Sequence, residues 1–180
     1  MIPLPLLALI LGVPLALVGW YVWNRGDNSA QDDTGPLSAS QGAAAAGTLS
    51  GAIGWPYYFG RGAPSTPWDD GPLGVDCSGF AQMALVRLGI LSSDATDRGA
   101  RTLADDSDPV DVGSQSPGDL AYYPGHVAVV VGYPGTDGHS SVMCASGHAT
   151  TFGDVEGEQV NVYSSALYRS DFVTYMRLRT

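Results

Sequence analysis

The sequence predicts an α+β domain in which helices come first and an antiparallel sheet follows. Two observations carry this prediction: a helical pattern over residues 76–89, and five short apolar runs further along the chain that short turns connect. A chain of 180 residues suffices for one domain with its own core, but not comfortably for two. We therefore expect a single globular domain.

The helical pattern, DCSGFAQMALVRLG, is the most regular periodic segment of that domain. Its apolar residues recur three and four positions apart, so that Phe80, Met83 and Ala84 share one face. Asp76 is a natural N-cap, and Gly89 is expected to end the helix.

The strand region follows a polar stretch rich in Asp, residues 94–119. Turn signals such as Pro117-Gly118 lie between or beside the apolar runs and indicate short connections. Short connections favour antiparallel neighbours, so we predict an antiparallel sheet of five to six strands. The runs expected to form strands are residues 120–123, 126–132, 140–145, 158–163 and 172–178.

The N-terminal segment, residues 2–23, contains no charged side chain and is long enough to cross a hydrocarbon layer of ~30 Å as a helix. Trp20 and Trp23 lie at one end, as in an interfacial aromatic belt. A cleaved signal peptide is the alternative, but there is no basic n-region and the apolar run is longer than usual. We predict a retained single-pass transmembrane helix.

Residues 24–50 are rich in Gly, Ala, Ser, Gln and Asp, and few of them are apolar enough to pack. This composition predicts a flexible linker. The globular domain is then expected to occupy residues 51–180.

The charge balance argues against nucleic acid as a partner. Asp and Glu number 18 against 8 Lys and Arg, which gives a net charge of −10, and no basic run is present. Such a surface repels phosphate backbones.

Cys77 lies at the first position of the predicted helix, where unpaired backbone N–H groups and the helix dipole stabilise an anion. Its thiol is therefore expected to ionise more readily than usual, which suits a nucleophile. The same N–H groups could form an oxyanion hole. The alternative is a buried cysteine that acts only as a small hydrophobe.

His126 begins an apolar run, so its imidazole is expected at a strand end, facing a neighbouring helix tip. There it could take the proton from Cys77 and later give it to a leaving amine. A structural histidine is the alternative.

Four segments in this order resemble the NlpC-type cell-wall endopeptidases, which are papain-like enzymes of bacteria and their phages. The resemblance covers about residues 53–178. The matching segments are 54–60 (GWPYYFG), 76–80 (DCSGF), 117–120 (PGDL) and 126–132 (HVAVVVG).

This resemblance implies a papain-like NlpC fold, with N-terminal helices packed on the sheet. It implies Cys77 as nucleophile and His126 as base, with Tyr57, Asp76 and Ser78 in the substrate groove. The implied substrate is the peptidoglycan stem peptide, cut between γ-D-glutamate and diaminopimelate without a cofactor.

The third catalytic position departs from the family pattern. The family usually has a polar residue, most often His, on the strand after the catalytic His, and alignment puts Cys144 there. A thiol is a weak hydrogen-bond partner for an imidazole, whereas His148, four residues on, is better suited. We predict His148 as the third catalytic residue, with Cys144 as the alternative.

Other clusters are weaker candidates. His139, Cys144 and His148 do not have the spacing of a zinc site, so we predict no metal. The acidic stretch around Asp105 and Asp108 lacks the pattern of a calcium loop. With two cysteines in the chain, a disulfide between Cys77 and Cys144 stays open as a redox hypothesis.

Together these features predict a membrane-anchored peptidoglycan hydrolase whose catalytic domain faces the cell wall, in a bacterial envelope or in a membrane-containing phage particle. One alternative is a CHAP-like peptidoglycan amidase, which uses the same chemistry on another bond. Another is a cell-wall-binding module without activity.

Overall fold

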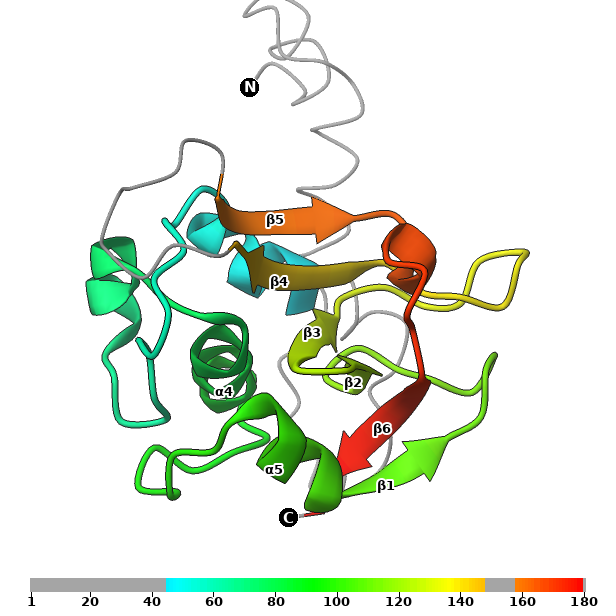
Figure 1. The fold of residues 1–180 in the computed structure, drawn as a ribbon, viewed down its shortest axis with the longest axis horizontal. Coiled ribbons are helices and arrows are strands. Elements are labelled where there is room, and N and C mark those ends of the chain that lie inside the picture. The colour runs from blue at the N-terminus through cyan, green and yellow to red at the C-terminus, as the bar shows by residue number, and fades with distance from the viewer. Residues whose placement is uncertain (1–44, 148–157, 180) are drawn as a thin grey trace, which may run out of the picture. The chain divides into compact units, whose positions relative to one another are not determined.

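A computed structural model of the chain describes residues 45–147 and 158–179 (Figure 1). All of these residues belong to one compact unit. Its centre is a six-stranded antiparallel sheet with the strand order β1-β6-β2-β3-β4-β5. The strands are β1 (Ser107–Val110), β2 (Leu120–Tyr123), β3 (His126–Val130), β4 (Val142–Ser146), β5 (Gln159–Tyr163) and β6 (Thr174–Leu178).

Short helices flank the sheet. Among them, α4 packs against β3 and β4, and α5 contacts β1, β3 and β6 (Figure 1). A helical stretch over residues 45–49 leads into the first 3₁₀ turn. The remaining helical elements are η1 (Ser50–Ala52), η2 (Trp68–Leu73), α4 (Cys77–Arg87), α5 (Ala100–Asp105) and η3 (Ala166–Tyr168).

Helix α4 is buried along most of its length, which explains its weak separation into polar and apolar faces. Phe80 and Leu85 are fully buried, and burial of side chains of this size stabilises the fold by about 2–3 kcal/mol each. Small residues such as Ala81 and Ala84 alternate with them and let the helix lie close to the sheet. The position of Cys77 at the helix start is therefore fixed by the core.

The sheet separates two hydrophobic clusters. The helix-side core includes Val127 and Val129, and the far-side core includes Ala128 and Val130. Because side chains alternate along a strand, β3 fills both clusters at once. Both faces of this strand are covered, which explains why its sequence is an unbroken apolar run.

The predicted α+β class and antiparallel sheet are confirmed, and the predicted helix and the five apolar runs correspond to α4 and β2–β6. Both β1 and α5 lie within the Asp-rich stretch that was not predicted to be ordered. Edge strand β1 contains Pro109, which an edge position tolerates because proline lacks an N–H.

The expected location in a membrane is corrected. The longest helix in the described part of the chain, α4, has 11 residues and is about 16 Å long, against the ~30 Å of a hydrocarbon core. No helix within residues 45–147 or 158–179 is both long and apolar enough to span a bilayer. The segment 2–23, on which that expectation rested, lies outside the described residues.

Candidate active site

Asp76 organises the N-terminus of α4, as its predicted role of N-cap requires. One carboxylate oxygen accepts hydrogen bonds from the Gly79 backbone N–H (2.7 Å) and the Ser78 hydroxyl (3.0 Å). The other accepts from the Gly60 backbone N–H (2.8 Å). This buried carboxylate thus joins the first turn of α4 to the 60–62 loop, while its role in a substrate groove stays a prediction.

The glycine of the DCSGF segment is required by close packing. A Cβ at Gly79 would lie 2.1 Å from the carbonyl oxygen of Arg61 and 2.8 Å from the Cα of Gly62. The same carbonyl of Arg61 accepts the Asp76 backbone N–H at 2.9 Å. The 60–62 loop is therefore pressed against the first turn of the helix, directly beside Cys77.

Cys77 is the first residue of α4 and is 9% exposed in the helix-side core. The pKa of its thiol is raised to about 11, mainly by burial and also by Asp76 and Cys144. The backbone N–H groups of Val127 and Ser78 act on the thiol in the opposite direction. The prediction of a thiol that ionises readily is wrong, because desolvation outweighs these donors.

His126 is the first residue of β3, as predicted, and is 7% exposed. Its Nε2 atom lies 2.8 Å from the hydroxyl of Tyr168, and its ring lies beside Tyr123 with centroids 5.6 Å apart. Burial, and next the Arg169 guanidinium, lower the imidazole pKa to about 4, while Asp171 acts in the opposite direction.

The structure brings Cys77 to the start of β3. Its thiol lies close enough to the Val127 backbone N–H for that group to lower its pKa, and Val127 follows His126 in the chain. Among the described residues, no hydrogen bond joins Cys77 to the His126 imidazole, whose partner is Tyr168. Both groups are neutral near pH 7, given the directions in which their pKa values move.

Tyr168 is a site residue that the sequence did not reveal. It ends η3, and its hydroxyl lies within hydrogen-bonding distance of two groups: Nε2 of His126 (2.8 Å) and Sγ of Cys144 (3.1 Å). The thiol of Cys144 in turn lies 3.2 Å from the Ser146 hydroxyl. These four side chains form a continuous polar line through the far-side core.

Tyr57 lies close to the candidate nucleophile. Its pKa is raised to about 12, mainly by burial and then by Cys77, Asp76 and Glu158. The ring also packs on the end of β4, since a Cβ added to Gly147 would lie 2.7 Å from its Cγ. Its place beside Cys77 agrees with the groove expected from the family, while contact with substrate stays a prediction.

The two candidates for the third position fare differently. His148 lies outside the described residues. Cys144 lies in β4, fully buried in the far-side core, and contacts Tyr168 rather than His126. Both Cys77 and Cys144 are free thiols in this structure, the first in the helix-side core and the second in the far-side core.

The remaining candidate residues have structural partners. His139 Nδ1 lies 3.2 Å from the Tyr175 hydroxyl. Asp108 of the acidic stretch pairs with Arg179 at 2.9 Å. Within the described ranges, no group of three or more His, Cys, Asp or Glu side chains is arranged to hold a metal ion.

The aspartate of the PGDL segment is also structural. Asp119 is buried and accepts two hydrogen bonds from Arg177, at 2.7 and 2.8 Å, which join the start of β2 to β6. It accepts a third from the Ser116 backbone N–H at 2.8 Å. The motif therefore fixes the strand that leads into His126.

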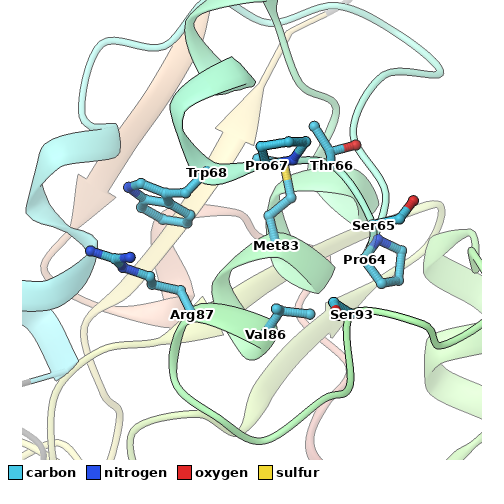
Figure 2. Close-up of a pocket in the computed structure, with 9 residues that line it drawn as sticks. All are labelled: Pro64, Ser65, Thr66, Pro67, Trp68, Met83, Val86, Arg87 and Ser93. Atoms are coloured by element: carbon cyan, nitrogen blue, oxygen red, sulfur yellow. The ribbon is translucent and has the colours of Figure 1, made fainter.

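A cavity of about 350 Å³ lies elsewhere, along the later turns of α4. Figure 2 shows Met83 and Arg87 of the helix facing Pro67, which precedes η2, and Trp68, which is the first residue of η2. Neither Cys77 nor His126 lines it. The cavity and the candidate nucleophile are thus separate features of the same helix.

No protein-family model matches the chain, and no curated protein does either. Solved structures do. The P60 domain of an antigen from M. avium subspecies paratuberculosis has a TM-score of 0.53 and 20% identity, over 78% of this chain and 96% of that one. The peptidoglycan hydrolase RipB from Mycobacterium tuberculosis has a TM-score of 0.53 and 21% identity, over 91% and 77%. NlpC2 from Trichomonas vaginalis gives 0.52 and 20%, over 87% and 50%.

Proposed function

We propose that this chain, which has the NlpC/P60 fold, is a peptidoglycan hydrolase that uses Cys77 as nucleophile and His126 as base. One observation carries the proposal: the first turn of α4 holds the Cys77 thiol at the backbone of Val127, directly after His126. The similar structure of RipB, which is named as a peptidoglycan hydrolase, supports the substrate class.

In this proposal the resting pair is neutral. With the thiol pKa near 11 and the imidazole pKa near 4, Cys77 keeps its proton and His126 lacks one at physiological pH. The sulfur attacks the peptide carbonyl carbon while its proton moves to the imidazole, which acts as general base. The imidazolium then protonates the leaving amine, and water hydrolyses the thioester.

Groups around the nucleophile can stabilise the negative charge that develops on the carbonyl oxygen. The first turn of α4 offers backbone N–H groups, and Tyr57 keeps its phenolic proton because its pKa is raised to about 12. The proposed substrate is the stem peptide, and the proposed bond joins γ-D-glutamate to diaminopimelate. Tyr57, Asp76 and Ser78 are the proposed groove residues.

A wall-binding module without activity is a second candidate. It is favoured by the burial of Cys77 and by the raised pKa of its thiol, which together leave little reactive thiolate near pH 7. A CHAP-like amidase is a further catalytic alternative that shares the same Cys and His chemistry.

The test incubates the full chain and its Cys77→Ala variant with purified peptidoglycan and identifies the released fragments by mass spectrometry. Thermal unfolding and wall binding of both proteins establish that the substitution leaves the fold intact. New amino termini on diaminopimelate, present only with the unaltered chain, are expected. Release at the bond between the glycan and the stem peptide would indicate the amidase, and binding without release would indicate the binding module.

A further inference from the structure

The polar line through the far-side core determines which nitrogen of His126 can act as a base. A neutral imidazole carries one proton, so one ring nitrogen donates and the other accepts. Nε2 faces the Tyr168 hydroxyl at 2.8 Å. If Nε2 carries the proton and donates a hydrogen bond to the Tyr168 hydroxyl, Nδ1 keeps a free lone pair that can accept the proton of Cys77.

The other members of the line allow this order of donors. The Tyr168 hydroxyl, having accepted from Nε2, can donate to Sγ of Cys144 at 3.1 Å. The thiol can donate in turn to the hydroxyl of Ser146 at 3.2 Å. Burial raises the pKa of both the phenol and the Cys144 thiol, so each keeps the proton that it donates.

The Tyr168 side chain is fixed by packing against two neighbouring aromatic rings. Its ring stacks on Tyr163 with centroids 3.9 Å apart and planes 13° apart, and it meets the edge of Tyr123. The hydroxyl of Tyr123 donates to the Ala166 carbonyl at 2.7 Å, and Ser165 caps η3. A side chain fixed in this way can orient a neighbour with little entropic cost.

Among the described residues, Cys144 makes no hydrogen bond of its own to the His126 imidazole. It stands on β4 at the position where alignment expects the orienting residue, yet its recorded partners are Tyr168 and Ser146. Its short side chain leaves room for the phenol that η3 brings in. The hydroxyl of Tyr168 therefore occupies the place beside Nε2.

We propose that Tyr168 is the positioning residue of this site and holds His126 in the tautomer protonated at Nε2, which leaves Nδ1 to serve Cys77. The inference rests on the proposed function for its catalytic consequence, but the tautomer can be measured without any substrate. Among the described residues, the other groups that face the imidazole are Tyr123 from β2, and Arg169 and Asp171 from the segment after η3.

The test uses nitrogen-15 NMR of the full chain to read the tautomer of His126 at pH 7, with assignment by loss of its signals in His126→Gln. The Tyr168→Phe variant keeps the ring and removes the hydroxyl. Tyr163→Phe is the matched control, because it removes a neighbouring hydroxyl that takes no part in the line. We expect the Nε2-protonated form in the unaltered chain and in Tyr163→Phe, and a mixture of tautomers in Tyr168→Phe.

On peptidoglycan fragments, Tyr168→Phe is expected to lower kcat by about 10- to 100-fold with KM nearly unchanged, as is typical when a supporting hydrogen bond is removed. Protonation of His126 at Nδ1 in the unaltered chain would overturn the inference. So would an unchanged tautomer in Tyr168→Phe. An inactive unaltered chain with the expected tautomer would refute only the proposed function.

Discussion

Acid should destabilise this fold in part through His126. Its pKa lies near 4 in the folded chain, chiefly because of burial and then of Arg169, against an ordinary value near 6.5. Between pH 6.5 and pH 4, His126 is therefore protonated in the unfolded chain but not in the folded chain. The stabilisation is complete above pH 6.5 and is lost as the pH falls through 4. At about 1.4 kcal/mol per pH unit, the loss between pH 7 and 4 is about 3 kcal/mol.

Urea unfolding of the full chain at several pH values measures this loss. Trp55 and Trp68, whose rings lie 4.6 Å apart, provide a fluorescence signal that changes when the core opens. Carboxylates also titrate in this range, so the same series is recorded for His126→Gln, which keeps the carboxylates and removes the titrating ring. The free energy of unfolding of the unaltered chain should fall by about 3 kcal/mol more than that of the variant between pH 7 and 4. Parallel pH curves for the two proteins would refute the reasoning.

Two substitutions test the framework around the site by urea unfolding at pH 7. Asp119→Asn removes the charge of a buried carboxylate whose partner, Arg177, is half-exposed, and should cost about 1.5–3 kcal/mol. Asp108→Asn, in a pair that is exposed on both sides, should cost less than about 1 kcal/mol. Equal losses would contradict this. Gly79→Ala forces a Cβ to within 2.1 Å of a backbone carbonyl and should cost about 1–3 kcal/mol, while Gly51→Ala in η1, where nothing lies within 4 Å, should change little. A stable Gly79→Ala chain would show that the 60–62 loop moves freely.

The elements that sequence patterns predicted are those whose burial follows from local periodicity. Helix α4 and strand β3 lie in the middle of the core, so almost every position along them is apolar or small. Because these elements are packed on all sides, the residue types that they tolerate follow from the packing that also determines their secondary structure. Their sequences are therefore informative without knowledge of the partner.

Strand β1 was not predictable in this way. Its sequence, SDPV, has a low strand propensity and contains Pro109. It becomes a strand because β6 offers an open edge, and Ser107 pairs with Leu178 in the register. Arg179 then bonds the carbonyl of Asp105 at 2.6 Å and fixes the chain just before the strand. Such tertiary causes leave no periodic trace in the segment itself.

The residues of the candidate site also differ in how far the sequence predicted them. Motif order predicted that Cys77 begins a helix and His126 begins a strand, and both positions are confirmed. Tyr168 was missed because it lies 42 residues after His126, in a short turn with no recognisable pattern. The pKa of Cys77 was predicted in the wrong direction because the helix position is visible in sequence, whereas burial of the thiol is not.

The position of Tyr168 and the raised pKa of Cys77 have a common consequence for the chemistry. In the proposed mechanism, a thiol and an imidazole that are both neutral at rest cannot rely on a preformed ion pair, so the proton moves during the attack. The basic nitrogen then has to be the one that faces the sulfur before substrate arrives. A phenol locked between two rings can enforce that choice, whereas a buried thiol, as a weak donor and acceptor, cannot. In the proposed mechanism, burial of the pair and fixation of the imidazole by Tyr168 are therefore two parts of one arrangement, in which charge develops only as the bond to sulfur forms.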